Sequence, residues 1–266
     1  MADAGGVMYG KPIIDLSDKV AIVTGSSRGI GRAIAEHLAR AGARVVISSR
    51  KPTPCDEVAE AIRGAGGQAI AAPCNISDRA QVDALVDRAL AEWGKVDILV
   101  CNAATNPYFG GLDGLADEVF HKIMHNNVLS NLWLAKRVAP GMIERRDGAI
   151  LMISSIGGLR GDPVIGAYNM SKAADMQLVR SLAVEYGPHN VRVNAIAPGL
   201  VKTDFARALW QNPDLKEMVE RRTPLGRIGE PDDIAPLAAL LCSPAGSFIT
   251  GQVLVADGGV TIAAAW

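Results

Sequence analysis

Tyr168 and Lys172 stand four residues apart in the segment Y-N-M-S-K. On a helix, this spacing places both side chains on one face, one turn apart. A tyrosine free in water has a pKa of about 10, and a nearby ammonium group favours the phenolate over the phenol. We therefore expect Tyr168 to exchange a proton with a substrate oxygen as a general acid and base, with Lys172 beside it.

Two more polar residues complete the candidate catalytic group. Ser155 follows the expected strand 149–153, thirteen residues before Tyr168. Its hydroxyl would donate a hydrogen bond to the substrate oxygen as charge develops there. Asn127, in H-N-N-V-L-S-N, would hold a water molecule against Lys172 and connect the site to solvent. A tyrosine and a lysine one turn apart are usually a surface pair, but their combination with Ser155 and a glycine-rich loop favours catalysis.

The glycine-rich loop is T-G-S-S-R-G-I-G, residues 24–31, between a short apolar run and a segment with helical spacing. Gly25, Gly29 and Gly31 allow tight turns and a close approach, so that a pyrophosphate can bind at the positive helix N-terminus. Glycines at a strand-to-helix turn are weak evidence alone, but here the strand and the helix are both expected. The loop therefore predicts a dinucleotide cofactor, and the site predicts hydride transfer between a carbonyl and an alcohol.

The choice of cofactor follows from the end of the second expected strand. NAD-binding proteins place an acidic residue roughly 20 residues beyond the glycines, where it binds the ribose hydroxyls. This chain reads I-S-S-R-K at 47–51, with Ser49 in place of the acid and Arg50 after it. Arg28 lies in the glycine loop itself. Two guanidinium groups suit a 2′-phosphate, so the sequence predicts NADP(H).

The remaining pattern indicates the scaffold. Apolar β-branched runs predict strands at 20–23, 44–47, 69–72, 97–101, 149–153, 191–196 and 252–255. Helical spacing predicts helices at 30–41, 56–65, 78–93, 115–145, 168–187 and 231–241. Strands this apolar are typical of a parallel sheet covered on both faces. We expect an α/β fold, a Rossmann-type doubly wound sheet of about seven parallel strands in a single domain.

Ligands of such a sheet bind beyond the carboxyl ends of its strands. The irregular segments 103–114, 155–167 and 199–230 all follow strand ends and are expected to line the pocket, with 199–230 as a lid. Five apolar residues in these segments would form a hydrophobic substrate wall: Tyr108, Phe109, Phe205, Leu209 and Trp210. We place the catalytic domain at 19–266, after an N-terminal extension, 1–18.

Composition excludes several classes of partner and site. The 27 basic and 28 acidic residues nearly balance, without a long run of like charge, so neither nucleic acid nor a membrane surface is expected. The cysteines at 55, 74, 101 and 242 are scattered, and His121 and His125 lack a third ligand, so no metal is expected. Without a recognisable leader or membrane span, the expected location is the cytoplasm.

These motifs together resemble the short-chain dehydrogenase/reductase family from about Lys19 to Gly259. The marks are T-G-S-S-R-G-I-G, C-N-A-A at 101–104, the residues Asn127, Ser155, Tyr168 and Lys172, N-A-I-A-P-G at 194–199, and the closing I-T-G-Q and D-G-G. The resemblance implies a seven-stranded parallel sheet, a tyrosine-centred proton relay, a Lys172 bond to the nicotinamide ribose and usually a homotetramer. Within the family, the chain resembles NADP-dependent carbonyl reductases and 3-oxoacyl-carrier-protein reductases.

The resemblance also implies the residues that contact the cofactor. Besides Tyr168 and Lys172, these are Gly25, Ser27, Arg28, Gly29, Ile30, Gly31, Ser49, Arg50, Asn75, Ile76, Asn102, Ala103, Ala104, Pro198, Gly199, Val201 and Thr203. The chain departs from the family at two places. Asn75-Ile76 stands where Asp-Val is frequent, and C-N-A-A stands where N-N-A-G is frequent. The Asn75 amide oxygen can still accept a bond from the adenine amine.

Other functions stay open. A carrier-protein enzyme would dock its partner through basic residues such as Arg145 and Arg146, but His189 occupies the second expected basic position. A free hydrophobic carbonyl compound therefore ranks slightly above a carrier-bound acyl group. An enoyl reductase would space its tyrosine and lysine farther apart, and an epimerase would need a longer chain. A non-catalytic NADP(H) sensor would tend to lose the Tyr168 and Lys172 pair.

Overall fold

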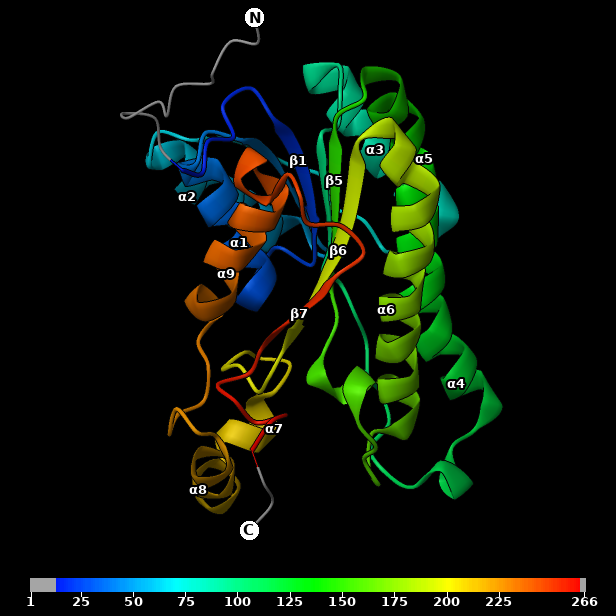
Figure 1. The fold of residues 1–266 in the computed structure, drawn as a ribbon, viewed down its shortest axis with the longest axis vertical. Helices are drawn as coiled ribbons and strands as arrows, with labels where there is room; N and C mark the ends of the chain where they lie inside the picture. Colours follow the sequence, from blue (N-terminus) through cyan, green and yellow to red (C-terminus); the bar gives the residue numbers. More distant parts are fainter. Residues whose placement is uncertain (1–12, 264–266) are drawn as a thin grey trace, which may run out of the picture.

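The computed structural model describes residues 13–263, which form a three-layer α/β domain (Figure 1). The strands are β1 (Val20–Thr24), β2 (Arg44–Ser48), β3 (Gln68–Ala71), β4 (Ile98–Cys101), β5 (Gly148–Ile153), β6 (Val191–Pro198) and β7 (Val253–Ala256). They form one parallel sheet in the order β3-β2-β1-β4-β5-β6-β7. The predicted Rossmann-type sheet of seven parallel strands is confirmed.

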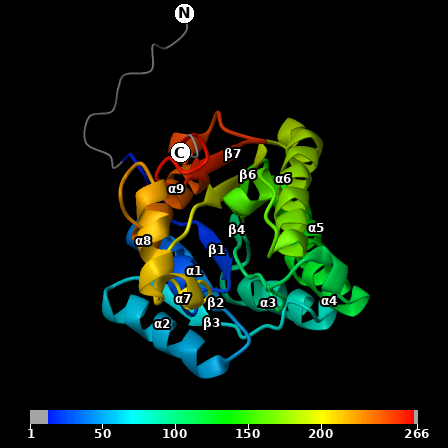
Figure 2. The ribbon, with the colours of Figure 1, turned by 90° about the horizontal axis from the view of Figure 1, so that it is seen from below.

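Helices cover both faces of the sheet, which explains why its central strands are apolar throughout (Figure 2). One face packs against α1 (Gly29–Arg40), α2 (Pro52–Gly64) and α9 (Pro231–Cys242). The other packs against α3 (Arg79–Trp93), α5 (Ser130–Arg145) and α6 (Gly166–Tyr186). The strand order reverses between β1 and β4, so the crevice at their carboxyl ends is the switch point where ligands of this fold bind.

The helix expected over 115–145 is divided into three parts. It begins as α4 (Asp117–Met124), continues through a π-helical turn, η2 (His125–Leu129), and resumes as α5. A π-turn inserts one residue into a helix without interrupting its hydrophobic spacing, so the periodicity does not reveal it. Such turns are frequent at functional sites, and this one contains Asn127. α2 begins at Pro52, four residues before the expected start, because proline suits the first turn of a helix.

The segment 199–230 leaves the sheet after β6 and carries α7 (Arg207–Trp210) and α8 (Pro213–Arg222). Its two ends meet where Val201 bridges Gly229 and the Lys202 amide donates to the Gly229 carbonyl at 2.9 Å. A cavity of about 230 Å³ lies at the base of the segment, beside the residues that follow β7. The two ends of the segment are therefore held together beside the sheet.

Residues 1–12 of the expected N-terminal extension lie outside the described residues. Leu16 is fully buried in the core, and its amide donates to the Ala41 carbonyl at 2.8 Å. The chain is therefore joined to the domain before β1 begins.

Candidate active site

Tyr168 and Lys172 lie on one face of α6, as their spacing predicts. Lys172 is only 2% exposed. Its Nζ donates to the Ile153 carbonyl at 2.9 Å and lies 5.8 Å from the centre of the Tyr168 ring. The Ser154 hydroxyl donates to the Lys172 carbonyl at 2.9 Å. The carboxyl end of β5 is thus bonded to the turn of α6 that carries the tyrosine and the lysine.

Ser155 follows β5 with an extended backbone and is half-buried. Its Oγ accepts a bond from the Gly157 amide at 3.0 Å, so the hydroxyl proton remains available to donate. A Cβ at Gly157 would lie 2.2 Å from Asn169 Oδ1. The turn after Ser155 therefore packs against α6 only because it contains glycine, and it brings Ser155 to the same end of the helix as Tyr168.

Asn127 is fully buried in the π-turn, with both ends of its amide bonded. Its Oδ1 accepts from the Thr105 amide at 2.8 Å, and its Nδ2 donates to the Thr105 carbonyl at 3.0 Å and to Ser171 Oγ at 2.9 Å. The side chain joins the loop after β4 to α6, next to Lys172. The backbone carbonyl of Asn127 accepts a 2.6 Å bond from Asn131 Nδ2.

Sequence reasoning missed two buried residues in this site, Asp175 and Asn131. Asp175 is fully buried, and its Oδ2 accepts a bond from Lys172 Nζ at 3.1 Å. Its Oδ1 accepts from Asn131 Nδ2 at 3.0 Å. The signal that could have revealed them was helical spacing. Asp175 stands three residues after Lys172, and Asn131 stands four residues after Asn127. Each polar residue falls where an apolar helix face was expected.

Burial and neighbouring charges act in opposite directions on the pKa values of Lys172 and Asp175. Burial alone would lower the pKa of Lys172, but the Asp175 carboxylate and the Tyr168 oxygen outweigh it and raise that pKa. Burial raises the pKa of Asp175, although the lysine beside it acts in the opposite direction. Burial likewise raises the pKa of the Cys101 thiol, which agrees with a packing role and not a nucleophile.

The glycine loop has the shape that its sequence implies. Gly25 and Gly29 have φ angles of +65° and +57°, a conformation that favours glycine. A Cβ at Gly31 would lie 2.4 Å from Asn102 Nδ2. That amide donates to the carbonyls of Thr24 and Gly25 at 2.9 and 3.1 Å and so fixes the loop against the end of β4.

The loop opens α1 in a way that fits a pyrophosphate. The helix begins with Gly-Ile-Gly-Arg, and within residues 13–263 no side chain caps its first turn. Its amide groups and the positive end of its dipole are therefore available to an anion. Ile30 lies in this turn, and Ser27 lies in the loop just before the helix. The Ala103 amide, which donates to Thr24 Oγ1 at 3.1 Å, continues the wall toward Ala104.

The residues expected at the adenosine end follow the neighbouring strands β2 and β3. The Ser26 amide donates to the Ser48 carbonyl at 3.1 Å, which holds the glycine loop beside the end of β2. Ser49 is half-buried and Arg50 is exposed. Arg28 is also exposed and pairs with Asp204 at 3.1 Å. Both guanidinium groups are thus accessible at the expected nucleotide edge.

Asn75 and Ile76 follow β3. The Asn75 amide oxygen accepts bonds from Ser77 Oγ at 2.9 Å and from the Ser77 amide at 3.3 Å, so both of its acceptor positions are occupied, and an adenine amine would have to compete with Ser77 for this oxygen. Ile76 packs at the edge of the core beneath α3.

The segment 199–230 crosses from the glycine loop to the tyrosine. A Cβ at Gly29 would lie 3.1 Å from Thr203 Cγ2, so Thr203 rests directly on the loop. The Phe205 ring centre is 6.0 Å from that of Tyr168. Trp210 Nε1 donates to the Thr203 carbonyl at 2.8 Å. Pro198, Gly199 and Val201 form the start of the segment at the end of β6.

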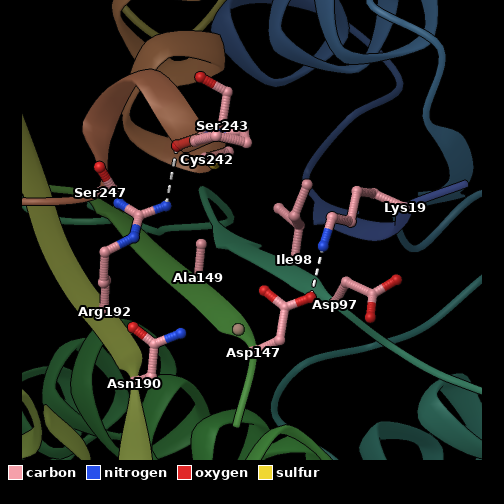
Figure 3. Close-up of a pocket in the computed structure, with 12 residues that line it drawn as sticks. Lys19, Asp97, Ile98, Asp147, Ala149, Asn190, Arg192, Cys242, Ser243 and Ser247 are labelled. Carbon is pink, nitrogen blue, oxygen red and sulfur yellow. Dashed lines mark hydrogen bonds and ion pairs between the residues drawn. The ribbon is translucent and has the colours of Figure 1, made fainter. Parts of the chain in front are cut away.

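A second polar region lies at the opposite end of the sheet, around a cavity of about 170 Å³ where β1, β4, β5 and β6 begin (Figure 3). Lys19 points toward Asp147 at its rim. Arg192 points to the end of α9, where its guanidinium donates to the carbonyls of Leu241, Ser243 and Gly246 at 2.6, 3.1 and 2.9 Å. The charged groups here are bonded to the protein itself, and none of the expected site residues lies among them.

The two histidines considered as metal ligands, His121 and His125, have other surroundings. His125 Nε2 is 3.1 Å from the Ser77 carbonyl and its ring packs edge-on against Trp133. His121 is exposed.

Across residues 13–263, the helices are too short or too polar to traverse a lipid bilayer.

Comparison with known proteins agrees with this geometry. The family model described as enoyl-(acyl carrier protein) reductase matches residues 25–261. Dehydrogenase/reductase SDR family member 4 of Sus scrofa is 42% identical over 96% of this chain and 90% of its own length. Among solved structures, a 7α-hydroxysteroid dehydrogenase complexed with NADH and 7-oxo glycochenodeoxycholic acid has a TM-score of 0.89 and 39% identity, covering 92% of this chain and 95% of that one.

A gluconate 5-dehydrogenase from Burkholderia cenocepacia, in complex with NADP and tartrate, has a TM-score of 0.90 and 34% identity, covering 94% of this chain and 98% of that one. The matches extend over nearly the whole chain, and they include both the glycine loop and the tyrosine helix. The chain belongs to the short-chain dehydrogenase/reductase family and is an oxidoreductase.

Proposed function

We propose that this protein is an NADP(H)-dependent carbonyl reductase that interconverts a hydrophobic ketone or aldehyde and its alcohol. The observation that carries the proposal is the buried Lys172 ammonium, held 5.8 Å from the Tyr168 ring at the carboxyl end of β5, beside the switch point. The family model names an enoyl reductase, but the four-residue spacing of Tyr168 and Lys172 is closer than those enzymes usually have.

The residues divide the chemistry between them. NADPH, when bound, supplies the hydride that adds to the carbonyl carbon. Tyr168 donates a proton to the carbonyl oxygen, and Ser155 donates a hydrogen bond to the same oxygen as negative charge develops. Lys172 stabilises the phenolate that Tyr168 leaves behind. Asn127 fixes the loop after β4 against α6 through its bonds to Thr105 and Ser171.

The cofactor preference rests on Arg28 and Arg50. Both are exposed beside the ends of β1 and β2, where a 2′-phosphate would receive charge-assisted bonds. One solved relative is named with NADP and another with NADH, so the fold alone does not decide. Arg50→Asp is expected to weaken NADPH binding about 10- to 100-fold and NADH binding by less than about 3-fold. Equal weakening of both cofactors would contradict the assignment; Arg88→Asp on α3 is the matched control.

The proposed substrate class follows from the segment above the tyrosine. Phe205 and Leu209 of this segment are 55% and 41% exposed, and the Phe205 ring centre lies 6.0 Å from that of Tyr168. Phe109, in the loop after β4, is 63% exposed, so apolar side chains from both segments are available to a hydrophobic substrate. The relative complexed with a 7-oxo compound acts as a precedent for a bulky apolar ketone. We therefore propose hydrophobic carbonyl compounds ahead of sugars.

A 3-oxoacyl-carrier-protein reductase is the second candidate. Arg145, one of the two arginines proposed for docking, donates to the Val96 carbonyl at 2.7 Å and pairs with Asp97 at 3.3 Å. Those residues precede β4 and lie at the amino end of the sheet, whereas Tyr168 lies at the carboxyl end. Arg146 donates to the Pro188 carbonyl, ahead of β6, at the same amino end. This placement favours a free substrate.

The test is NADPH and NADH oxidation, followed by absorbance, with aromatic ketones, α-dicarbonyls, retinal and acetoacetyl thioesters. Turnover with NADPH that falls at least about 1000-fold in Tyr168→Phe supports the proposal. Turnover confined to carrier-bound thioesters would favour the second candidate. Tight NADPH binding without turnover across the panel would favour a sensor.

Assembly and location are proposed on narrower grounds. β7 is an edge strand, and exposed apolar residues lie on it and beside it: Phe248, Val255 and Ile262. An exposed apolar edge favours pairing with another copy, which supports the homotetramer. Light scattering after gel filtration tests the proposed tetramer.

The cellular location is proposed from the cysteines. All four are free and buried, which suits the reducing cytoplasm, and cell fractionation tests this location.

A further inference from the structure

A continuous chain of buried side chains runs from the π-turn to Lys172. The Asn127 carbonyl accepts from Asn131 Nδ2 at 2.6 Å, and the same nitrogen donates to Asp175 Oδ1 at 3.0 Å. Asp175 Oδ2 then accepts from Lys172 Nζ at 3.1 Å. None of these residues is more than 2% exposed. The bonds join α5 and α6 through polar groups where two helices would normally pack through apolar ones.

Stability does not account for this arrangement. Removing two charges from water costs several kcal/mol, and well-packed apolar residues in place of a buried ion pair are often neutral or stabilising. The same two helices also carry buried apolar residues, among them Leu134, Ala135 and Met176. Asp175 faces one cation, Lys172, and that cation faces Tyr168.

We propose that Asp175, held by Asn131, is the positioning residue for Lys172, and that its carboxylate raises the pH at which the Tyr168 and Lys172 pair releases its first proton. The inference rests on the proposed function of Tyr168 as acid and base. Its consequence is directional: the pair stays protonated at neutral pH, so the site is set to donate a proton to a carbonyl.

The argument for the direction is a count of charge. With Asp175 ionised, the protonated site is neutral, because the ammonium and the carboxylate cancel. Release of a proton then leaves a net negative charge in a buried site. Without the carboxylate, the site starts with a net positive charge, and releasing a proton makes it neutral. The first release becomes easier whichever member of the pair supplies the proton.

No other charged group of the described residues competes with this effect at close range. Besides Tyr168 and Asp175 on α6, the titratable group that acts on Lys172 is Cys101 on β4, a buried thiol. β5 contributes the uncharged Ile153 carbonyl, and α5 contributes the uncharged Asn131 amide.

The experiment compares the wild-type protein with Asp175→Asn, which keeps the shape of the side chain and removes its charge. Tyrosinate absorbance is titrated in each protein without cofactor, and the matching Tyr168→Phe protein is subtracted to isolate one of the four tyrosines. The midpoint is expected to fall by about one to two pH units. The alkaline limb of NADPH-dependent reduction should move to lower pH by a similar amount.

Two further variants keep the result decisive. Asn131→Leu with Asp175→Leu replaces the polar link by an apolar one, and it substitutes for Asp175→Asn if the unpaired amide prevents folding. Asp56→Asn removes an exposed carboxylate from α2, on the other face of the sheet, and should leave the midpoint unchanged.

An unmoved midpoint in a folded Asp175 variant would overturn the inference and leave Asp175 as a packing residue. Absence of turnover in the wild-type protein would instead overturn the proposed function. The tyrosinate titration would still decide the role of Asp175, because it requires no substrate.

Discussion

The two ends of the sheet both collect charged side chains, but they enclose them differently. At the amino end, Asp97 is 2% exposed and is surrounded by two cations, Lys95 and Arg145, at 3.0 and 3.3 Å, while the Val20 amide donates to it at 2.9 Å. Those cations reach solvent. At the carboxyl end, Lys172 and Asp175 are both buried and depend chiefly on each other.

This difference in solvent exposure indicates a different role for the charged residues at each end of the sheet. Charges at a solvent-accessible rim are screened and share several partners, so they join strand ends without acting strongly on a neighbour. An enclosed pair is not screened, and its field reaches the adjacent Tyr168 ring. The amino end is therefore expected to govern stability alone, and the carboxyl end both stability and proton transfer.

Removing Lys172 tests the contrast most severely. Lys172→Met leaves the Asp175 carboxylate buried with only the Asn131 amide, which should cost about 3–5 kcal/mol in unfolding free energy and abolish turnover. Urea denaturation and NADPH oxidation measure the two effects. The double variant Lys172→Met with Asp175→Leu removes both charges and should regain most of the stability without any turnover. Recovery of turnover in that double variant would contradict the assigned role of the lysine.

The sequence predicted the scaffold well for a physical reason that does not extend to this pair. Seven apolar runs separated by helical spacing determine a parallel sheet, and the strands lie within about two residues of their expected bounds. The positions of Tyr168, Lys172 and Ser155 follow from a helix turn and a strand end. Asp175 was not anticipated, because its meaning depends on Asn131 from a second helix, and sequence spacing does not show which helices touch.

The π-turn was missed for a related reason. Hydrophobic periodicity over 115–145 averages across many turns and is insensitive to one inserted residue. The insertion nevertheless turns the Asn127 carbonyl toward Asn131 and its amide toward Thr105. The partners of the two arginines could not be predicted from the sequence either. Arg145 pairs with Asp97, far from the tyrosine in the fold, because α5 runs back toward the amino end of the sheet.

Arg192→Met is the corresponding test at the amino end. The change removes the donors to three carbonyls at the end of α9 and leaves those acceptors to water, which should cost about 1–3 kcal/mol. The rate of NADPH oxidation and its pH dependence should not change in the folded variant. Arg180→Met, an exposed change on α6, is the control for loss of an arginine. A shifted pH profile in Arg192→Met would break the division between the two ends.

Asp233 tests whether burial or position in the fold sets the size of a charge effect, because it lies at the carboxyl end of the sheet but is exposed. Its bonds to Arg227, at 2.6 and 2.7 Å, and to the Glu230 amide lower its pKa to about 2 from 3.8. A lowered pKa gives stability that is present above pH 3.8 and is lost as the pH falls through about 2. Asp233→Asn should therefore cost about 1 kcal/mol or less at neutral pH, and the difference should vanish toward pH 2 in acid denaturation. A deficit that persisted at pH 2 would assign the effect to shape and not charge.

The smallest effect is expected from Lys19 and Asp147, the rim pair of the amino-end cavity, whose side chains are 26% and 51% exposed. Lys19→Met should lower the unfolding free energy by about 0.5 kcal/mol or less, and added salt should reduce the difference further, because solvent screens an exposed pair. The same salt series applied to Asp175→Asn should leave its titration midpoint displaced, because solvent ions do not reach an enclosed pair. Equal salt sensitivity at both ends would mean that burial is not what distinguishes them, and the proton-transfer role of Asp175 would lose its physical basis.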